Sequence, residues 1–229
     1  MAFPQVVGTN SSQQTTDVTS HTVALPSGIV AGELLVVILA IAVGSDSGTY
    51  PAGWNKLGAA GANNIAASWG WRVADGTEGA SITVTTSGAQ ESAHQSFRIQ
   101  GHNSSTNVPQ TGGAGSGTDS SAEVHSFAPT GGAKDYLFIA YAAADSGVAA
   151  TSAPTSFTNL VVSDSGSDAN ASCAISTARR ELNAASIDPD QFTLEASEGW
   201  LTALIGVHPG VEGNPAPTVS WTVGLTIGF

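Results

Sequence analysis

Residues 25–40 read LPSGIVAGELLVVILA, and residues 127–142 read FAPTGGAKDYLFIAYA. Each stretch has a turn rich in proline and glycine, then one acidic residue (Glu33 or Asp135), and then an apolar run. A short apolar run bounded by turn residues is typical of a buried strand. The two stretches therefore predict equivalent buried strands in a chain whose halves repeat one plan.

The residues that follow each apolar run also match. An Asp-Ser-Gly turn comes next in both halves, at 46–48 and at 145–147. Then each half has a proline followed at equal spacing by an aromatic residue and a leucine. We predict that these four side chains form the core of a pseudo-repeat: Trp54 and Leu57 in the first half, and Phe157 and Leu160 in the second.

Composition and periodicity both indicate strands. Charged residues make up only 10% of the chain, against about 25% in an average globular protein. Residues 65–73 alternate between apolar and small side chains with a period of two, as a half-buried strand does. A helical turn is considered only at 178–186, where the preceding strand continues equally well. The predicted fold is all-β: an antiparallel β-sandwich of jelly-roll or Greek-key type, built from two pseudo-repeated halves.

The predicted halves cover 23–102 and 124–210. Residues 1–22 are polar and are expected to form an N-terminal arm that orders in an assembly. Residues 103–123 are rich in Gly, Ser and Thr and predict an extended connection over the surface. We expect one continuous sandwich rather than two modules, because five strands alone leave an apolar face exposed.

Residues 211–229 form a C-terminal tail after a proline-marked break. Its apolar residues alternate, as in a strand, and are the predicted partner-binding residues: Trp221, Val223, Leu225, Ile227 and Phe229. Such a strand either adds an edge to its own sheet or pairs with another chain.

The charge excludes some partners. The net charge is −12 with a pI near 4.4, and only six residues are Lys or Arg. This balance argues against nucleic acid and against an anionic membrane surface as partners. With so few cations, four arginines are each expected to pair with an acid: Arg72, Arg98, Arg179 and Arg180. The N-terminus shows no signal-peptide pattern, which predicts synthesis in a cytoplasm, and the apolar run 34–43 is far shorter than the ~20 residues that span a bilayer.

The sequence gives no support for an enzyme. The stretch GAGSG at 113–117 matches the serine-nucleophile pattern, but it falls in the expected connection rather than between a strand and a helix. We therefore predict no catalytic residue, no metal site and no cofactor. The histidines are scattered and suit structural roles better than zinc binding, namely His21, His94, His102, His125 and His208. Cys173 suits core packing.

Two further patterns have alternative interpretations. Four aspartates lie in Gly/Ser/Pro-rich loops and have the oxygens that calcium prefers, but we favour a role as turn residues: Asp164, Asp168, Asp188 and Asp190. Five tryptophans offer a platform for stacking on sugars, although core packing is favoured because Trp54 stands where the second half has Phe157. The five are Trp54, Trp69, Trp71, Trp200 and Trp221.

Four stretches together resemble a family of small β-sandwich proteins found in tailed-bacteriophage structural modules and related prophage regions. They are PSGIVAGELLVV (26–37), PAGWNKL (51–57), WRVADGTEGASITVT (71–85) and FRIQG (97–101). The resemblance covers roughly 23–101, the second half being a degenerate copy. The hydrophobic tail departs from the pattern and leaves the role within a virion open.

The resemblance implies a non-enzymatic virion structural protein, made in the host cytoplasm. The leading expectation is a capsid decoration or cement protein that binds the major capsid protein and forms homo-oligomers, with a trimer as the expected state. The alternative is a receptor-binding or carbohydrate-binding module on a tail fibre. An exposed aromatic cluster would favour that alternative.

Overall fold

The computed structural model describes residues 2–103, 109–168 and 171–210. Within these ranges the ordered elements are strands, without a helix, and neighbouring strands pair antiparallel. The predicted all-β sandwich is confirmed. The described part has no helix of the length and apolarity that a membrane span requires.

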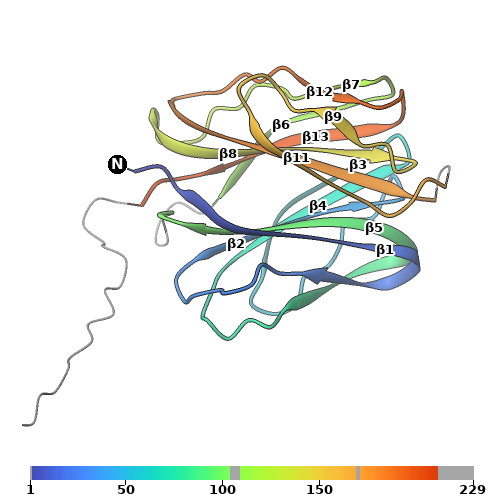
Figure 1. Cartoon of the computed structure of the whole chain (residues 1–229), viewed down its shortest axis with the longest axis horizontal. Helices are drawn as coiled ribbons and strands as arrows, with labels where there is room; N and C mark the ends of the chain where they lie inside the picture. Colours follow the sequence, from blue (N-terminus) through green and yellow to red (C-terminus); the bar gives the residue numbers. More distant parts are fainter. Residues whose placement is uncertain (1, 104–108, 169–170, 211–229) are drawn as a thin grey trace, which may run out of the picture.

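The first sheet is formed by the N-terminal part of the chain. Its strands, in spatial order β1-β5-β2-β4-β3, are β1 (Gln5–Ala24), β5 (Ser81–Gln100), β2 (Leu34–Ile41), β4 (Ile65–Val73) and β3 (Asn55–Ala62). This is the lower layer in Figure 1.

The second sheet stacks face to face on the first. Its order is β10-β11-β8-β13-β6, with β10 (Thr158–Asp164), β11 (Cys173–Ala184), β8 (Lys134–Asp145), β13 (Trp200–Val207) and β6 (Gln110–Gly117). A small third sheet, β7-β12-β9, lies above the second sheet in Figure 1. Its strands are β7 (Ser121–Glu123), β12 (Gln191–Leu194) and β9 (Ala150–Ser152).

The two large sheets share one strand order. Counted along the chain, the strands of the first sheet lie in the order first, fifth, second, fourth, third, and so do those of the second sheet once the three short strands are set aside. A repeat would give this arrangement, although the pseudo-repeat of the two halves stays a prediction.

Three apolar clusters hold the layers together. The largest lies between the two big sheets, where Ile38 of β2 and Tyr141 of β8 belong to the same cluster. The second lies between the second and third sheets, around Phe138 and Phe192. The third covers the outer face of the first sheet, around Leu39. Strands β2 and β8 are therefore buried on both faces, which explains why their sequences are continuous apolar runs.

Two segments differ from the sequence-based expectation. The segment expected to be an N-terminal arm is β1, an edge strand that pairs along β5. Its side chains are polar, so the sequence did not indicate a strand, because an edge strand is held by backbone hydrogen bonds. The expected connection forms β6 and β7. Its glycines indicated a linker, but they permit close packing: a Cβ on Gly112 would stand 2.2 Å from the ring of Phe127.

Candidate binding surface

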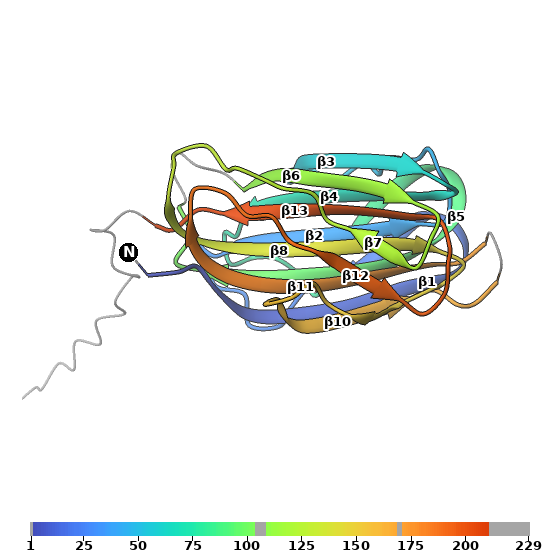
Figure 2. The same ribbon diagram turned by 90° about the horizontal axis from the view of Figure 1, so that it is seen from above.

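Strands β3 and β6 lie at one side of the sandwich. They are the edges of their sheets, and Figure 2 shows them side by side at one side of the molecule. Among the described strands, β3 pairs only with β4 and β6 only with β13. Edge strands present N–H and C=O groups in a row, and such a row accepts a strand from another chain.

The composition of these two strands leaves most of the row without charge. Their sequences, NKLGAAGA and QTGGAGSG, contain no acidic residue although the chain has 18. Lys56 is their one charged residue, and its Nζ donates to the backbone carbonyl oxygen of Gly48 at 3.2 Å. Two carbonyl oxygens of β6 already have donors, Gly113 from the backbone N–H of His125 at 3.1 Å and Gly117 from the Asn63 side chain at 2.9 Å. Charged residues or proline usually keep an edge strand from pairing with another chain. The neighbouring edges of β3 and β6 are therefore a candidate site for strand addition.

The edges on the opposite side differ. There β1 and β10 lie together (Figure 2), and each carries an aspartate, Asp17 in β1 and Asp164 in β10. The Ser163 hydroxyl of β10 donates to the backbone oxygen of Ser12 in β1 at 3.0 Å. This side differs in carrying negative charge, whereas a hydrogen bond joins the two sheets on both sides, here from Ser163 and on the β3–β6 side from Asn63 to Gly117 at 2.9 Å.

The predicted partner-binding residues of the tail, Trp221, Val223, Leu225, Ile227 and Phe229, lie outside the described residues. Their role stays a prediction.

The predicted pseudo-repeat residues occupy corresponding turns. The backbone N–H of Trp54 donates to Pro51 at 3.2 Å, and that of Phe157 to Pro154 at 3.0 Å. Trp54 is half-buried and stacks on Tyr50, whereas Phe157 is buried under the third sheet.

The two leucines, in contrast, pack in different places. Leu57 contacts the cluster between the large sheets, and Leu160 contacts the cluster around Phe138. Both β3 and β10 contain a register shift near these residues, which changes the face that a side chain occupies.

Two histidines and a serine that are far apart in the sequence meet beneath the outer face of the first sheet. The hydroxyl of Ser92 lies 2.6 Å from Nδ1 of His21 and 2.7 Å from Nε2 of His94. Nδ1 of His94 lies 3.0 Å from the hydroxyl of Ser12. Ser92 and both histidines have no exposed surface. A substrate cannot reach them, so the arrangement acts as a structural network.

Burial determines the charge of these histidines. Loss of solvation, with a smaller effect from His21, lowers the pKa of His94 to about 3. The pKa of His21 is also lowered by burial, with Asp46 opposing the change. Both rings are therefore neutral at pH 7, and their ring nitrogens are hydrogen-bonded to hydroxyl groups.

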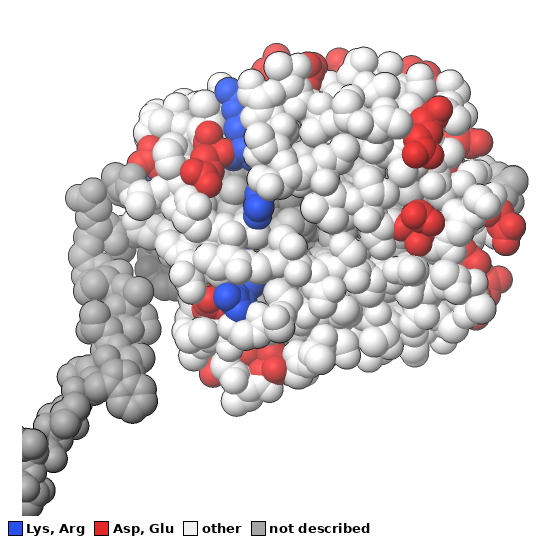
Figure 3. All heavy atoms as spheres, in the orientation of Figure 1, with Lys and Arg blue, Asp and Glu red and all other residues white. Residues whose placement is uncertain are grey.

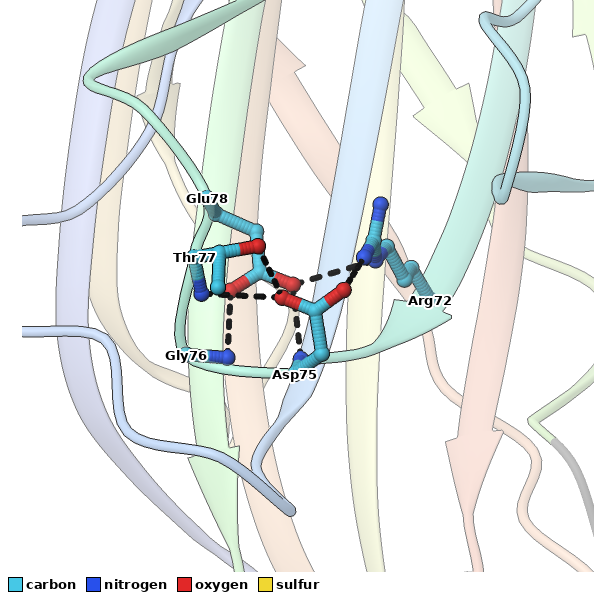
Figure 4. Close-up of polar contacts among 5 residues, drawn as sticks. All are labelled: Arg72, Asp75, Gly76, Thr77 and Glu78. Carbon is cyan, nitrogen blue, oxygen red and sulfur yellow. Dashed lines mark hydrogen bonds and ion pairs between the residues drawn. The ribbon is translucent and has the colours of Figure 1, made fainter.

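The turn between β4 and β5 contains a compact polar cluster (Figure 4). Arg72 pairs with Asp75 and, at 3.0 Å from its Nε, with Glu78. Glu78 accepts from the backbone N–H groups of Asp75 and Gly76, and Asp75 accepts from that of Thr77 at 2.8 Å. Hydrogen bonds from Thr77 are the largest cause of the lowered pKa of Asp75. Because these carboxylates already have donors within the turn, the cluster stabilises the loop and is not a candidate ligand site.

A polar hollow of about 370 Å³ lies at one end of the sandwich. It is lined by the Asn63–Asn64 turn, by Asp145 at the end of β8, and by Glu198. Burial raises the pKa of the Asp145 carboxyl, and the negative charge of Glu198 raises it further. No group of three potential metal-ligating side chains exists among the described residues.

Cys173 is buried between the large sheets. Burial raises the pKa of its thiol to about 12, which suppresses the reactive thiolate. Its position agrees with the expected core role.

Comparison of the chain with protein-family models, with curated proteins and with solved structures finds no match. The expected relation to phage structural proteins therefore rests on the sequence pattern alone.

Sequence reasoning missed the open edges and the buried histidine network. Both depend on pairings between residues that are far apart, such as His21 opposite Val84 and Ser12 opposite His94. A local signal existed for the network: Ser92 and His94 are two positions apart in a strand, so they share a face.

Proposed function

We propose that this chain is a non-enzymatic structural protein of a phage virion, a capsid decoration or cement subunit. Its partners would be the major capsid protein and further copies of itself, in a trimer, within the virion. The observation that best supports a role in assembly is the pair of neighbouring edges of β3 and β6, which contain no acidic residue.

The occupant that we propose for these edges is the tail strand 221–229 of a second copy. Its alternating apolar residues suit strand addition, in which backbone hydrogen bonds give affinity and alternate side chains give specificity. On a capsid lattice, many such contacts act together and strengthen binding that is weak for one copy.

The receptor-binding alternative finds less support on the described surface. Among large hydrophobic side chains, those exposed in the described part are Val7 and Val30, and neither is aromatic. A stacking platform for neutral sugars needs exposed rings.

The proposal predicts saturable binding of the full-length chain to capsids that lack it, measured by co-sedimentation. Ala59 is an exposed residue of β3, and A59D places a charge beside the open edge; we expect it to weaken binding about tenfold or more. Truncation after Gly210 should abolish binding.

The matched control is T15D, which adds the same charge on the exposed side of β1, at the opposite edge. It should bind as the unaltered chain does. Absence of binding by the full-length chain, or equal weakening by A59D and T15D, would contradict the proposal.

A further inference from the structure

Two of the four arginines lack the acidic partner that the sequence led us to expect. Arg72 pairs with Asp75 and Glu78, and Arg98 pairs with Glu33. Arg179 and Arg180, adjacent in β11, form no ion pair with any described residue. In a chain with 18 acidic residues and a net charge of −12, two neighbouring unpaired arginines require an explanation.

The chain that follows each arginine shows why Arg72 has acidic partners and Arg180 has none among the described residues. Arg72 lies opposite Leu35 of β2, and Arg180 lies opposite Phe138 of β8. After Arg72 the chain turns and supplies two carboxylates. After Arg180 it continues as a strand to Ala184, so no acidic turn closes over the arginine.

Both arginines line a hollow of about 270 Å³, where β10 begins beside β11. Its other polar lining residues are Ser156, Thr158, Asn159 and Glu181. A water molecule occupies about 30 Å³ in the liquid. The hollow therefore has the volume of about nine water molecules, enough for a small ligand.

One guanidinium is incompletely bonded. Arg179 is half-buried, and its Nη1 is buried without a hydrogen-bond partner. Burial lowers the pKa of Arg179, an effect that the nearby Glu181 opposes. A desolvated donor without an acceptor is costly, so the guanidinium gains from a rotation that brings this donor to an anion held in the hollow.

The lining indicates the kind of anion. A guanidinium presents a planar fork of donors that matches a carboxylate. Glu181 opposes a doubly charged phosphate, but its carboxylate accepts hydrogen bonds from hydroxyl groups. Gln5 of β1 already donates to Oε1 of Glu181 at 2.9 Å, which holds this acceptor at the rim.

We propose that the hollow between β10 and β11 binds a small hydroxylated carboxylic acid of the hexuronic acid type. Arg179 holds the carboxylate, Arg180 adds positive charge at the rim, and Asn159 and Glu181 bind the hydroxyl groups. On the face drawn in Figure 3, the Lys and Arg atoms lie in one half of the molecule, and the Asp and Glu atoms lie in both halves. This site does not depend on the assembly role proposed above.

The test is a titration of the ¹⁵N-labelled full-length chain with D-glucuronate, followed by two-dimensional NMR. We expect saturable shifts of the Asn159 amide and the Arg179 Nε–H signals. D-glucose, which lacks the carboxylate, should give no saturable shift. Acetate, which lacks the hydroxyl groups, and inorganic phosphate should each bind about tenfold more weakly or worse.

The variant R179Q should weaken glucuronate binding about tenfold or more, because a charge-assisted contact is lost. R72Q, which alters an arginine that already has partners, should leave binding unchanged. The NMR spectrum itself reports whether each variant is folded, and R180Q serves if R179Q is not. Absence of saturable glucuronate binding, equal binding by the arginine variants of the hollow, or equally tight acetate or phosphate binding would overturn the proposal.

Discussion

The free energy of unfolding should fall by roughly 3 kcal/mol between pH 6.5 and pH 4 through His94 alone. His94 is neutral in the folded chain, because its pKa is lowered to about 3, whereas in the unfolded chain a histidine has a pKa of about 6.5. Below pH 6.5 His94 therefore binds a proton in the unfolded chain but not in the folded chain. The stability is fully present above pH 6.5 and is lost as the pH falls toward 3.

Other groups act in the same direction, and the experiment has to separate them. Burial also lowers the pKa values of His21, His102 and His208. Aspartates with lowered pKa values, such as Asp46, contribute only near and below pH 4. The interval from pH 6.5 to pH 5 therefore reports mainly the buried histidines, and the raised pKa of the Asp145 carboxyl acts in the opposite direction.

Urea unfolding of H94Q at several pH values measures the contribution of His94. The dependence of stability on pH should decrease by about 1.4 kcal/mol per pH unit relative to the unaltered chain. H125Q, which replaces an exposed histidine, is the matched control variant. If H94Q keeps the full dependence, His94 is not the buried neutral group described above.

The second large effect concerns the face of β8 that lies under the third sheet. F138A should destabilise the chain by about 3 to 5 kcal/mol, because it leaves a cavity in a packed region. Phe138 has no exposed surface, and its ring lies against those of Tyr136 and Phe127, with centroids 5.5 Å and 6.4 Å away.

Urea unfolding at pH 7 measures this effect as well. V30A is the control, because Val30 is 54% exposed and its truncation should change stability by less than about 0.5 kcal/mol. If F138A lowers the free energy of unfolding by less than about 1 kcal/mol, the third sheet does not pack tightly on this face of β8.

The sequence predicted the elements whose signals are local. The apolar runs that became β2 and β8 were recognised because strands buried on both faces contain little else. The turns before Trp54 and Phe157 were recognised from their equal spacing. The all-β class followed from the scarcity of charged residues and the period of two in residues 65–73.

The sequence failed where the deciding contact is distant. Strand β6 looked like a linker, because glycine is read as flexibility when its partner, here the ring of Phe127, is not known. Strand β1 was predicted as an arm, because pairing with β5 uses backbone groups and requires no particular side chains. The unpaired state of Arg179 was equally invisible, since it depends on which carboxylates the fold brings near.

Hydrogen–deuterium exchange of the chain, free and bound to capsids, tests the central claim that β3 and β6 are the assembly surface. Strand addition forms new backbone hydrogen bonds, so amides in 55–62 and 110–117 should exchange more slowly in the bound chain. Those of β1 and β10 should not change. If amide exchange in the bound chain slows only in β1 and β10, or does not slow in β3 and β6, the result contradicts this claim.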